Sequence, residues 1–351
     1  MIDFTIEGVA DLIPYNSLVN QIKQFNDYSI IGEDSSGLYD VYKIELGVKG
    51  KPIILLMASM HGTEYQASIC LINLLRDLEK NERVNTSFRK RLIDNYHIIA
   101  FPCINPYGFD NTTRYAVTKG RHGFTGQDIN NDFHKTKFNI IESVNLRPYL
   151  DNKKTIAFVD QHLQRNLNPE TADIAPSIAH PVQNYMLNNI VGKLSEQFPN
   201  KTIGRRLATH WNYSGRIRAY MSFHKNIYTE QTLGFSGEIG RPVQESDGFY
   251  EPNTNREIFT IGYSMYYYSI VEIMNYFDLK NGTSDIEVDD EAISKVNSPI
   301  KDISYMRDNN GLISSISEYV KKGQYKNKTI KTKINRDKFG KMVSYERELE
   351  D

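Results

Sequence analysis

The sequence predicts an α/β fold with a mixed central sheet flanked by helices, followed by a small C-terminal all-β domain. Three observations support this fold class. Short apolar runs are typical of strands covered on both faces. Helical patterns lie between and after these runs, as expected where strands alternate with helices. The composition then changes near residue 280, where an acidic segment rich in small residues begins.

Four apolar runs are expected to be strands, and two longer segments are expected to be helices. In the segment Gln66–Asn81, apolar side chains recur every three residues on one face, and the segment Arg256–Phe277 is apolar nearly all round, as in a well-buried helix. The predicted strands are Pro52–Ser59, His97–Asn105, Thr155–Asp160 and Thr232–Gly240.

The composition change divides the chain into three predicted parts. Residues 1–280 form the large domain, residues 281–298 a linker, and residues 299–351 a small β domain with turns at Gly311, Gly323 and Gly340. A charged, partly disordered tail is the alternative for the last part.

Charge and cysteine content exclude several classes of protein. The 351 residues carry a formal net charge of -1, which gives no electrostatic reason to expect nucleic acid or an anionic membrane as a partner. No apolar run approaches the roughly 18 residues of a spanning helix, and the acidic first residues do not resemble a secretory signal. The two cysteines, Cys70 and Cys103, lie in apolar stretches and are expected to be free thiols, as in a cytoplasmic protein.

A candidate metal site begins where the first predicted strand ends. His61 and Glu64 are three residues apart, so an imidazole and a carboxylate can reach one ion from a single turn. Zinc accepts both ligand types, and catalytic zinc sites keep three protein ligands and one open position. A chance pair at a helix start is the alternative interpretation of this H-x-x-E motif.

Two further strands supply companions for this pair. His162 follows the apolar run of the third predicted strand, and Asp160 is a candidate for fixing a ring tautomer. Glu238 lies within the glycine-rich apolar run GFSGEIG, where a carboxylate usually has a purpose or a partner, so it is a candidate general base. A satisfied polar histidine and a structural salt bridge are the alternatives for His162 and Glu238.

The segment Ile104–Phe133 is predicted to be a long polar loop that begins with Asn-Pro-Tyr-Gly. It carries Arg114 and Arg121, and a fixed guanidinium in such a loop would stabilise an oxyanion or hold a carboxylate. Plain surface charges are the alternative for both arginines.

The order of these motifs resembles the zinc carboxypeptidase family over roughly Tyr15–Phe277. The order is H-x-x-E, N-P-x-G, R-x-x-x-x-G-x-D-x-N, D-x-H and then a strand glutamate. The resemblance implies that one zinc ion is bound by His61, Glu64 and His162, and that Glu238 is the general base. It also implies that Arg121 stabilises the oxyanion, with Arg114 the weaker candidate by spacing, and that Asn130 helps to bind the substrate carboxylate.

One position departs from the family pattern. Asn131 stands where the family has an arginine that clamps the substrate carboxylate, and an amide cannot form that charged, bidentate contact. Substitute cations are sought among Arg205, Arg206, Arg216 and Arg218. The family's mobile active-site tyrosine is expected at Tyr213 or Tyr220, with plain packing as the alternative for both.

The C-terminal segment carries a second resemblance. Its glycine spacing around YVKKGQ is similar to the small β domain of the succinylglutamate desuccinylase and aspartoacylase branch, whose members hydrolyse N-acyl amino acids. The expected function is therefore zinc-dependent hydrolysis of a peptide or amide bond in a small carboxylate-bearing substrate. Carboxypeptidase-like activity is favoured slightly over deacylation, and a non-catalytic binding module on the same fold is the third possibility.

Overall fold

The computed structural model describes two compact units, which comprise residues 1–283 and 284–351. The described residues are 13–120, 123–134, 137–164, 172–176, 181–205, 216–222, 224–228, 231–240, 255–281, 300–307, 313–320, 328–336 and 342–350.

The first unit is built on a mixed eight-stranded sheet, as the sequence predicts. Its strands follow the order β1-β2-β4-β3-β7-β10-β8-β9, and the centre of the sheet, from β4 through β3 and β7 to β10, is parallel. The strands are β1 (Tyr28–Glu33), β2 (Asp40–Gly47), β3 (Ile53–Ala58), β4 (His97–Phe101), β7 (Thr155–Gln164), β8 (Ala172–Pro176), β9 (Ile203–Arg205) and β10 (Leu233–Gly240).

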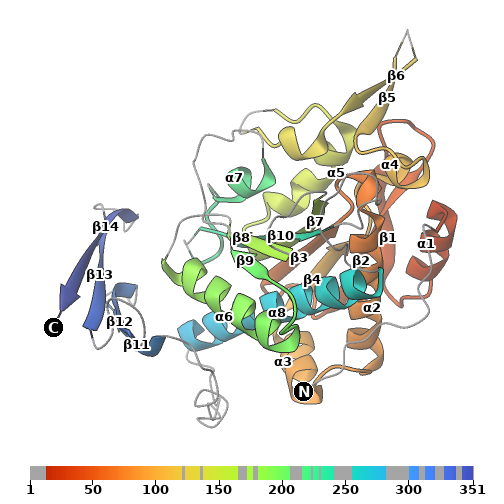
Figure 1. Ribbon diagram of the computed structural model, residues 1–351. Helices are drawn as coiled ribbons and strands as arrows, with labels where there is room; N and C mark the ends of the chain where they lie inside the picture. Colours follow the sequence, from red (N-terminus) through yellow and green to blue (C-terminus); the bar gives the residue numbers. More distant parts are fainter. Residues whose placement is uncertain are drawn as a thin grey trace. The chain divides into compact units, whose positions relative to one another are not determined.

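Helices cover both faces of this sheet (Figure 1). One face packs against α2 (Tyr65–Lys80), α3 (Thr86–Asn95), α6 (Pro181–Gln197) and α8 (Asn255–Asn281). The other face packs against α5 (Ile141–Leu150) and α7 (Ile217–Ser222), while α1 (Tyr15–Ile22) contacts β2 and α4 (Pro106–Asp110). The two long predicted helices are therefore present as α2 and α8.

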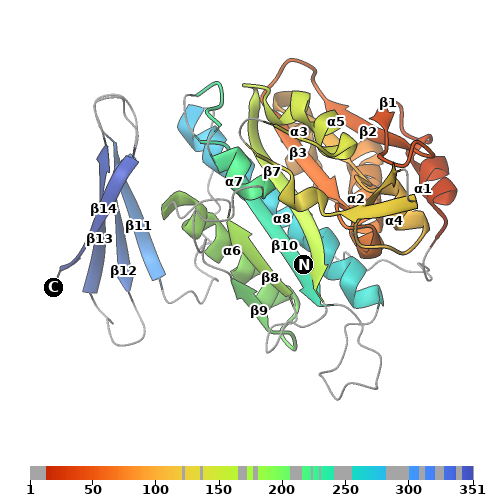
Figure 2. The same cartoon turned by 90° about the horizontal axis from the view of Figure 1, so that it is seen from above.

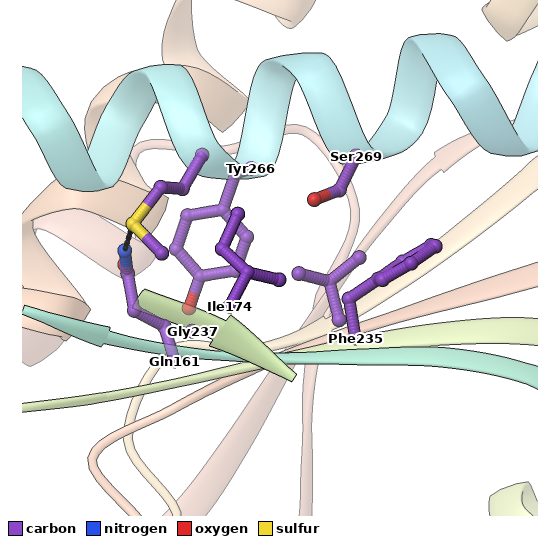
Figure 3. Close-up of a pocket in the computed structure, with 8 residues that line it drawn as sticks. Gln161, Ile174, Phe235, Gly237, Tyr266 and Ser269 are labelled. Atoms are coloured by element: carbon purple, nitrogen blue, oxygen red, sulfur yellow. Dashed lines mark hydrogen bonds between the residues drawn. The ribbon is translucent and has the colours of Figure 1, made fainter. Parts of the chain in front are cut away.

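The central strands β7 and β10 lie side by side (Figure 2). Each strand presents different side chains to the two helical layers. Because side chains alternate along a strand, Phe158 of β7 packs in the core under α5 and α7, whereas Val159 and Gln161 lie on the α8 side, and Figure 3 shows Gln161 pointing toward this helix. His162 shares the face of Phe158. The strand is longer than predicted, so His162 lies within β7 rather than after it.

The prediction of a long loop over Ile104–Phe133 is wrong. This segment contains α4, a hairpin of β5 (Ala116–Gly120) and β6 (Gly123–Gln127), and a 3-10 turn over Ile129–Asn131. Local side-chain caps explain the two helical turns: Asn105 Oδ1 accepts from the Gly108 N–H at 2.9 Å, and Asp128 Oδ1 accepts from the Asn130 N–H at 3.0 Å.

The second unit is a four-stranded antiparallel sheet in the order β11-β12-β13-β14. Its strands are β11 (Ile300–Arg307), β12 (Ile313–Val320), β13 (Lys328–Arg336) and β14 (Met342–Glu350). The predicted turn glycines and the predicted linker from residue 282 onward lie outside the described residues.

Cys70 and Cys103 are both buried and free, as the sequence predicts. Among the helices that the structure describes, none is long and apolar enough to cross a membrane.

Candidate metal centre

The turn that follows β3 is held in an unusual backbone conformation. Ser59 has a φ of 48°, in the left-handed region that few residues other than glycine adopt. Its hydroxyl lies 2.6 Å from Ser68 Oγ of α2 and donates to the Glu64 carbonyl at 3.0 Å. These contacts offset the strain and fix the turn that carries His61 and Glu64 into the site.

A close backbone contact fixes the same turn from its other side. Gly62 lies so near α4 that a Cβ at this position would come within 2.0 Å of the Gly108 carbonyl carbon. The N–H of Gly62 donates to the Arg114 carbonyl at 3.2 Å, and Asn105 Nδ2 donates to the same oxygen at 3.3 Å. The Asn-Pro-Tyr-Gly motif therefore positions both the metal-facing turn and the backbone of Arg114.

The three predicted ligands meet in one buried cluster. His61, Glu64 and His162 each offer a ligand atom, and these atoms all lie within 4.8 Å of one another. The Nδ1 of His61 is 2.9 Å from Glu64 Oε1, and the Nδ1 of His162 is 2.9 Å from Glu64 Oε2. The two Nδ1 atoms are 3.2 Å apart, so both rings turn the same nitrogen toward the cluster.

The outer nitrogen of each histidine ring faces a carboxylate. His162 Nε2 lies 2.6 Å from Asp160 Oδ2, and His61 Nε2 lies 3.2 Å from Asp128 Oδ1. Metal-binding histidines usually donate their second N–H in this way, because the acceptor fixes both the tautomer and the orientation of the ring. Asp160 was a sequence candidate for this role, whereas Asp128 was not assigned one.

The electrostatics of the cluster keep its carboxylates ionised. Burial alone would raise the pKa of Glu64, but the charge and hydrogen bond of His162, together with those of His61, hold that pKa well below its usual range. Burial would likewise raise the pKa of Asp128, but its hydrogen bond with His61 and the positive charge of Arg114 lower it. Both groups are thus available as anionic ligand and acceptor.

These donors fit a catalytic zinc ion. Two neutral imidazole nitrogens and one carboxylate oxygen form a ligand set that zinc binds in hydrolases, where the fourth position stays open. The negative charge of the buried Glu64 carboxylate would balance part of the positive charge of the ion. Each histidine ring already has a carboxylate acceptor for its second N–H. Among the described residues, these three form the one group of this kind.

The candidate general base lies beside this cluster. Glu238 of β10 pairs with His162 of β7 in parallel register, so their side chains leave the same face of the sheet from neighbouring strands. Glu238 is half-buried, whereas the three ligands are buried. This placement suits a carboxylate that handles protons at the edge of the metal site.

Of the two candidate arginines, the structure brings Arg114 to the cluster. Its Nη1 donates to Glu64 Oε1 at 3.0 Å, and its Nη2 lies 3.1 Å from His61 Nε2. Arg121 lies outside the described residues. By its spacing from the Asp-x-Asn motif, Arg114 was the weaker of the two candidates for stabilising the oxyanion. The contacts that hold its backbone come instead from Asn105 and Gly62, which lie earlier in the chain.

The predicted substrate-binding residues do not all lie near the cluster of His61, Glu64 and His162. Asn130 is buried, and its Oδ1 accepts from the Ile217 N–H at 3.5 Å. Asn131 is exposed, and its Nδ2 donates to Asp128 Oδ2 at 3.0 Å. Tyr220 is a core residue whose hydroxyl donates to Asp151. Asp151 precedes the first residue of β7, so this contact lies near the opposite end of the strand from His162. Tyr213 and Arg206 lie outside the described residues.

This geometry can be compared with known families. Residues 30–145 match the family model of the zinc carboxypeptidases. The matched segment includes His61, Glu64, Arg114 and Asp128, and it ends before His162 and Glu238. The match implies zinc as the metal for this site. The comparison with curated proteins gave no match.

Several solved structures, two of them described as carboxypeptidases, share the fold. A metallo-carboxypeptidase from Burkholderia cenocepacia is 12% identical with a TM-score of 0.56, and the match covers 75% of this chain and 69% of that one. Carboxypeptidase A from Helicoverpa armigera is 12% identical with a TM-score of 0.54, covering 74% and 71% of the two chains. Bovine thrombin-activatable fibrinolysis inhibitor, solved with a tick carboxypeptidase inhibitor, is 11% identical with a TM-score of 0.54, covering 77% and 98%.

Proposed function

We propose that this protein is a zinc-dependent hydrolase of a peptide or amide bond in a substrate that carries a carboxylate near the scissile bond. The observation that carries the proposal is the buried cluster of His61, Glu64 and His162, in which both histidines turn Nδ1 inward and Nε2 toward a carboxylate. Three ligands leave a position open for chemistry, whereas structural zinc sites are closed by four.

Each residue of the site has a definite task in this reaction. Zinc held by the three ligands would polarise the substrate carbonyl and lower the pKa of a water molecule at its open position. Glu238 takes a proton from the attacking water and later gives it to the leaving amine, for which its place beside His162 is suited. Asp128 and Asp160 hold the two rings in the required tautomer.

Arg114 is proposed to stabilise the negative charge that develops on the carbonyl oxygen. Its guanidinium already lies beside Glu64 and His61, and it approaches from a half-exposed position where a substrate would enter. A fixed cation at this point acts on the transition state more than on the neutral substrate. Arg114 thereby takes the role that motif spacing had given to Arg121.

Metal content is the first test. Purified wild-type protein is expected to hold about one zinc per chain, and His162→Ala is expected to lose it, because removing one of three ligands leaves an incomplete site. Elemental analysis after dialysis measures both. If neither protein holds zinc, even after incubation with the metal, the hydrolase proposal fails.

The second test separates catalysis from binding. Glu238→Gln is expected to retain zinc and to lose roughly 10²- to 10⁴-fold in kcat, because the amide cannot accept the proton. Zinc content and hydrolysis of N-blocked dipeptides are measured on the same preparation. Unchanged hydrolysis in this variant would refute the role of Glu238, whereas a zinc-loaded wild type that hydrolyses none of the substrates would support the remaining alternative, in which the fold serves binding alone.

Deacylation of N-acyl amino acids is the second candidate. The observation that favours it is the side chain of Asn131, which donates to Asp128 and is not a cation. Parallel assays with C-terminal dipeptides and with N-acyl amino acids distinguish the two reactions, because each class of enzyme is expected to prefer its own substrates in kcat/KM.

A further inference from the structure

The loops that precede the central strands β3, β7 and β10 are joined to one another at the amino ends of these strands. The Ile53 N–H donates to the Lys154 carbonyl at 2.7 Å, and Lys154 Nζ donates to the Gly50 carbonyl at 2.8 Å. On the other side, the Ile227 N–H donates to the Lys153 carbonyl at 2.6 Å. These hydrogen bonds make the three loops one continuous surface.

This surface exposes lysines together with two aliphatic side chains. Val48 and Ile227 are each 43% exposed. The segment that carries Lys153 and Lys154 contacts both loops, so it lies between the two aliphatic residues. We call the exposed side chains of these loops the basic face, which consists of Val48, Lys51, Lys153, Lys154, Lys225 and Ile227.

The positive charge of the basic face is not neutralised by its neighbours. Among the residues that the structure describes, its four lysines form no ion pair. The acidic groups nearby have other partners, because Asp27 pairs with Lys49 at 2.8 Å and Asp151 pairs with Arg147 at 3.1 Å. The whole chain has a formal net charge of -1, so the excess of positive charge is local to this face.

The side-chain types of the basic face favour one kind of partner. Protein interfaces are depleted in lysine and enriched in arginine and aromatic residues. Sites for single-stranded nucleic acid add aromatic rings on which bases stack. The six residues include neither an arginine nor an aromatic ring. Lysines around exposed aliphatic side chains suit an anionic membrane surface, where the ammonium groups meet the headgroups and the aliphatic groups reach the acyl boundary.

We infer that the basic face binds the surface of a membrane that contains anionic lipids. Each lysine near such a surface contributes about fivefold in affinity, so four lysines support reversible binding that salt weakens. The metal cluster lies at the other end of the same strands, because His61 follows β3 and His162 and Glu238 lie in the second halves of β7 and β10. Binding would therefore direct the metal site away from the lipid. The inference does not depend on the proposed function.

Cosedimentation of the whole chain, loaded with zinc, with large vesicles tests the inference. The vesicles consist of phosphatidylcholine alone or with about 30% phosphatidylglycerol. The wild type is expected to bind only the anionic vesicles and to be released when the salt concentration is raised from about 0.1 M to about 0.5 M. Lys153→Glu is expected to weaken binding about 5- to 25-fold. Ile227→Ser is expected to weaken it about 3- to 10-fold, because its apolar surface no longer enters the acyl boundary.

Matched variants outside the basic face are the controls. Lys137→Glu makes the same change of charge at another exposed lysine, and Ile141→Ser replaces an isoleucine of α5 that is 45% exposed. Both are expected to bind the anionic vesicles as the wild type does.

Three outcomes would overturn the inference. The first is equal binding to both kinds of vesicle, or binding to neither. The second is an equal loss in Lys137→Glu and Lys153→Glu, which would show an effect of net charge alone. The third is unchanged vesicle binding in Ile227→Ser together with tight binding of a DNA duplex, which would make the basic face a general site for polyanions.

Discussion

Asp160 and Asp128 each accept a hydrogen bond from the outer nitrogen of a metal-facing histidine, and they belong to different kinds of local structure. Asp160 is part of β7, two residues before His162 on the same face. Asp128 caps the 3-10 turn over Ile129–Asn131 while it faces His61. The orientation of the two rings therefore depends on one strand and one turn that are separate in sequence.

Replacing Asp160 with asparagine is expected to weaken zinc binding about 10- to 100-fold without unfolding the protein. The amide oxygen still accepts from His162 Nε2, but it lacks the charge that strengthens the imidazole as a ligand. Zinc affinity is measured by competition with a chromogenic chelator.

Asp132→Asn is the matched control. Asp132 is also buried, but it accepts hydrogen bonds from the N–H groups of Asn139 and Ile140 rather than from a histidine of the cluster. This variant is expected to lose stability and keep its zinc affinity. Equal zinc affinities in Asp160→Asn and the wild type would contradict the role of Asp160.

At the residue scale, the sequence identified the three side chains that meet in the cluster, but not most of the residues that hold them in place. His61, Glu64 and His162 follow or end apolar runs, and strands of a parallel sheet bring such positions together. The positions of Asp128 and Arg114 depend instead on α4 and on nearby turns. These short segments show no apolar periodicity from which they could be predicted. The contacts of Arg114 with Glu64 and His61 arise because Asn105 and Gly62 hold its carbonyl.

The contact between α4 and the turn after β3 determines the position of the metal-facing loop. Gly62 and Gly108 approach so closely that neither backbone leaves room for a side chain at position 62. Gly108 is held in turn by Asn105, whose Oδ1 accepts its N–H. This explains in physical terms why the chain has glycine after His61 and glycine in Asn-Pro-Tyr-Gly.

Gly62→Ala is expected to destabilise the protein by about 1–3 kcal/mol and to weaken zinc binding, because the added methyl group overlaps the Gly108 backbone and the turn must move. Gly192→Ala in α6 is the control. A Cβ at position 192 meets nothing within 4 Å, so this variant is expected to be equal to the wild type or more stable by about 0.5–1 kcal/mol. Urea unfolding measures both, and similar curves for the two variants would refute the contact.

At the element scale, periodicity predicted the elements that are long or wholly buried. The helices α2 and α8 and the strands β3, β4, β7 and β10 follow from their apolar patterns. The shorter elements of Ile104–Phe133 were missed because each is fixed by a single cap or by pairing with its neighbour, such as β5 with β6. Five-residue elements of this kind carry too few apolar residues for a period to be visible.

At the scale of the whole molecule, the mixed central sheet was predictable from composition and pattern alone. Strand order was not, because it depends on which strands pair across long separations, such as β2 with β4 and β10 with β8. The β2–β4 pairing also creates a buried polar contact, in which His97 Nε2 lies 2.7 Å from Glu45 Oε2.

This contact is expected to make stability depend on pH below about 7. Burial, with smaller effects from Lys43 and Lys49, lowers the pKa of His97 below its ordinary value, although Glu45 partly opposes the shift. Between the lowered folded pKa and the unfolded value near 6.5, the unfolded chain binds more protons, so stability falls as the pH falls through that range. The slope from one such histidine is at most about 1.4 kcal/mol per pH unit.

His97→Gln is expected to flatten that slope, since glutamine can still donate to Glu45 but does not titrate. Urea unfolding of metal-free protein between pH 7.5 and about pH 5 measures how the free energy of unfolding changes with pH in each protein. The contributions of the histidines that both proteins share cancel when the variant is compared with the wild type. His224, whose pKa burial also lowers, leaves a residual slope in the variant. A His97→Gln slope equal to that of the wild type would show that this buried contact does not couple protonation to folding.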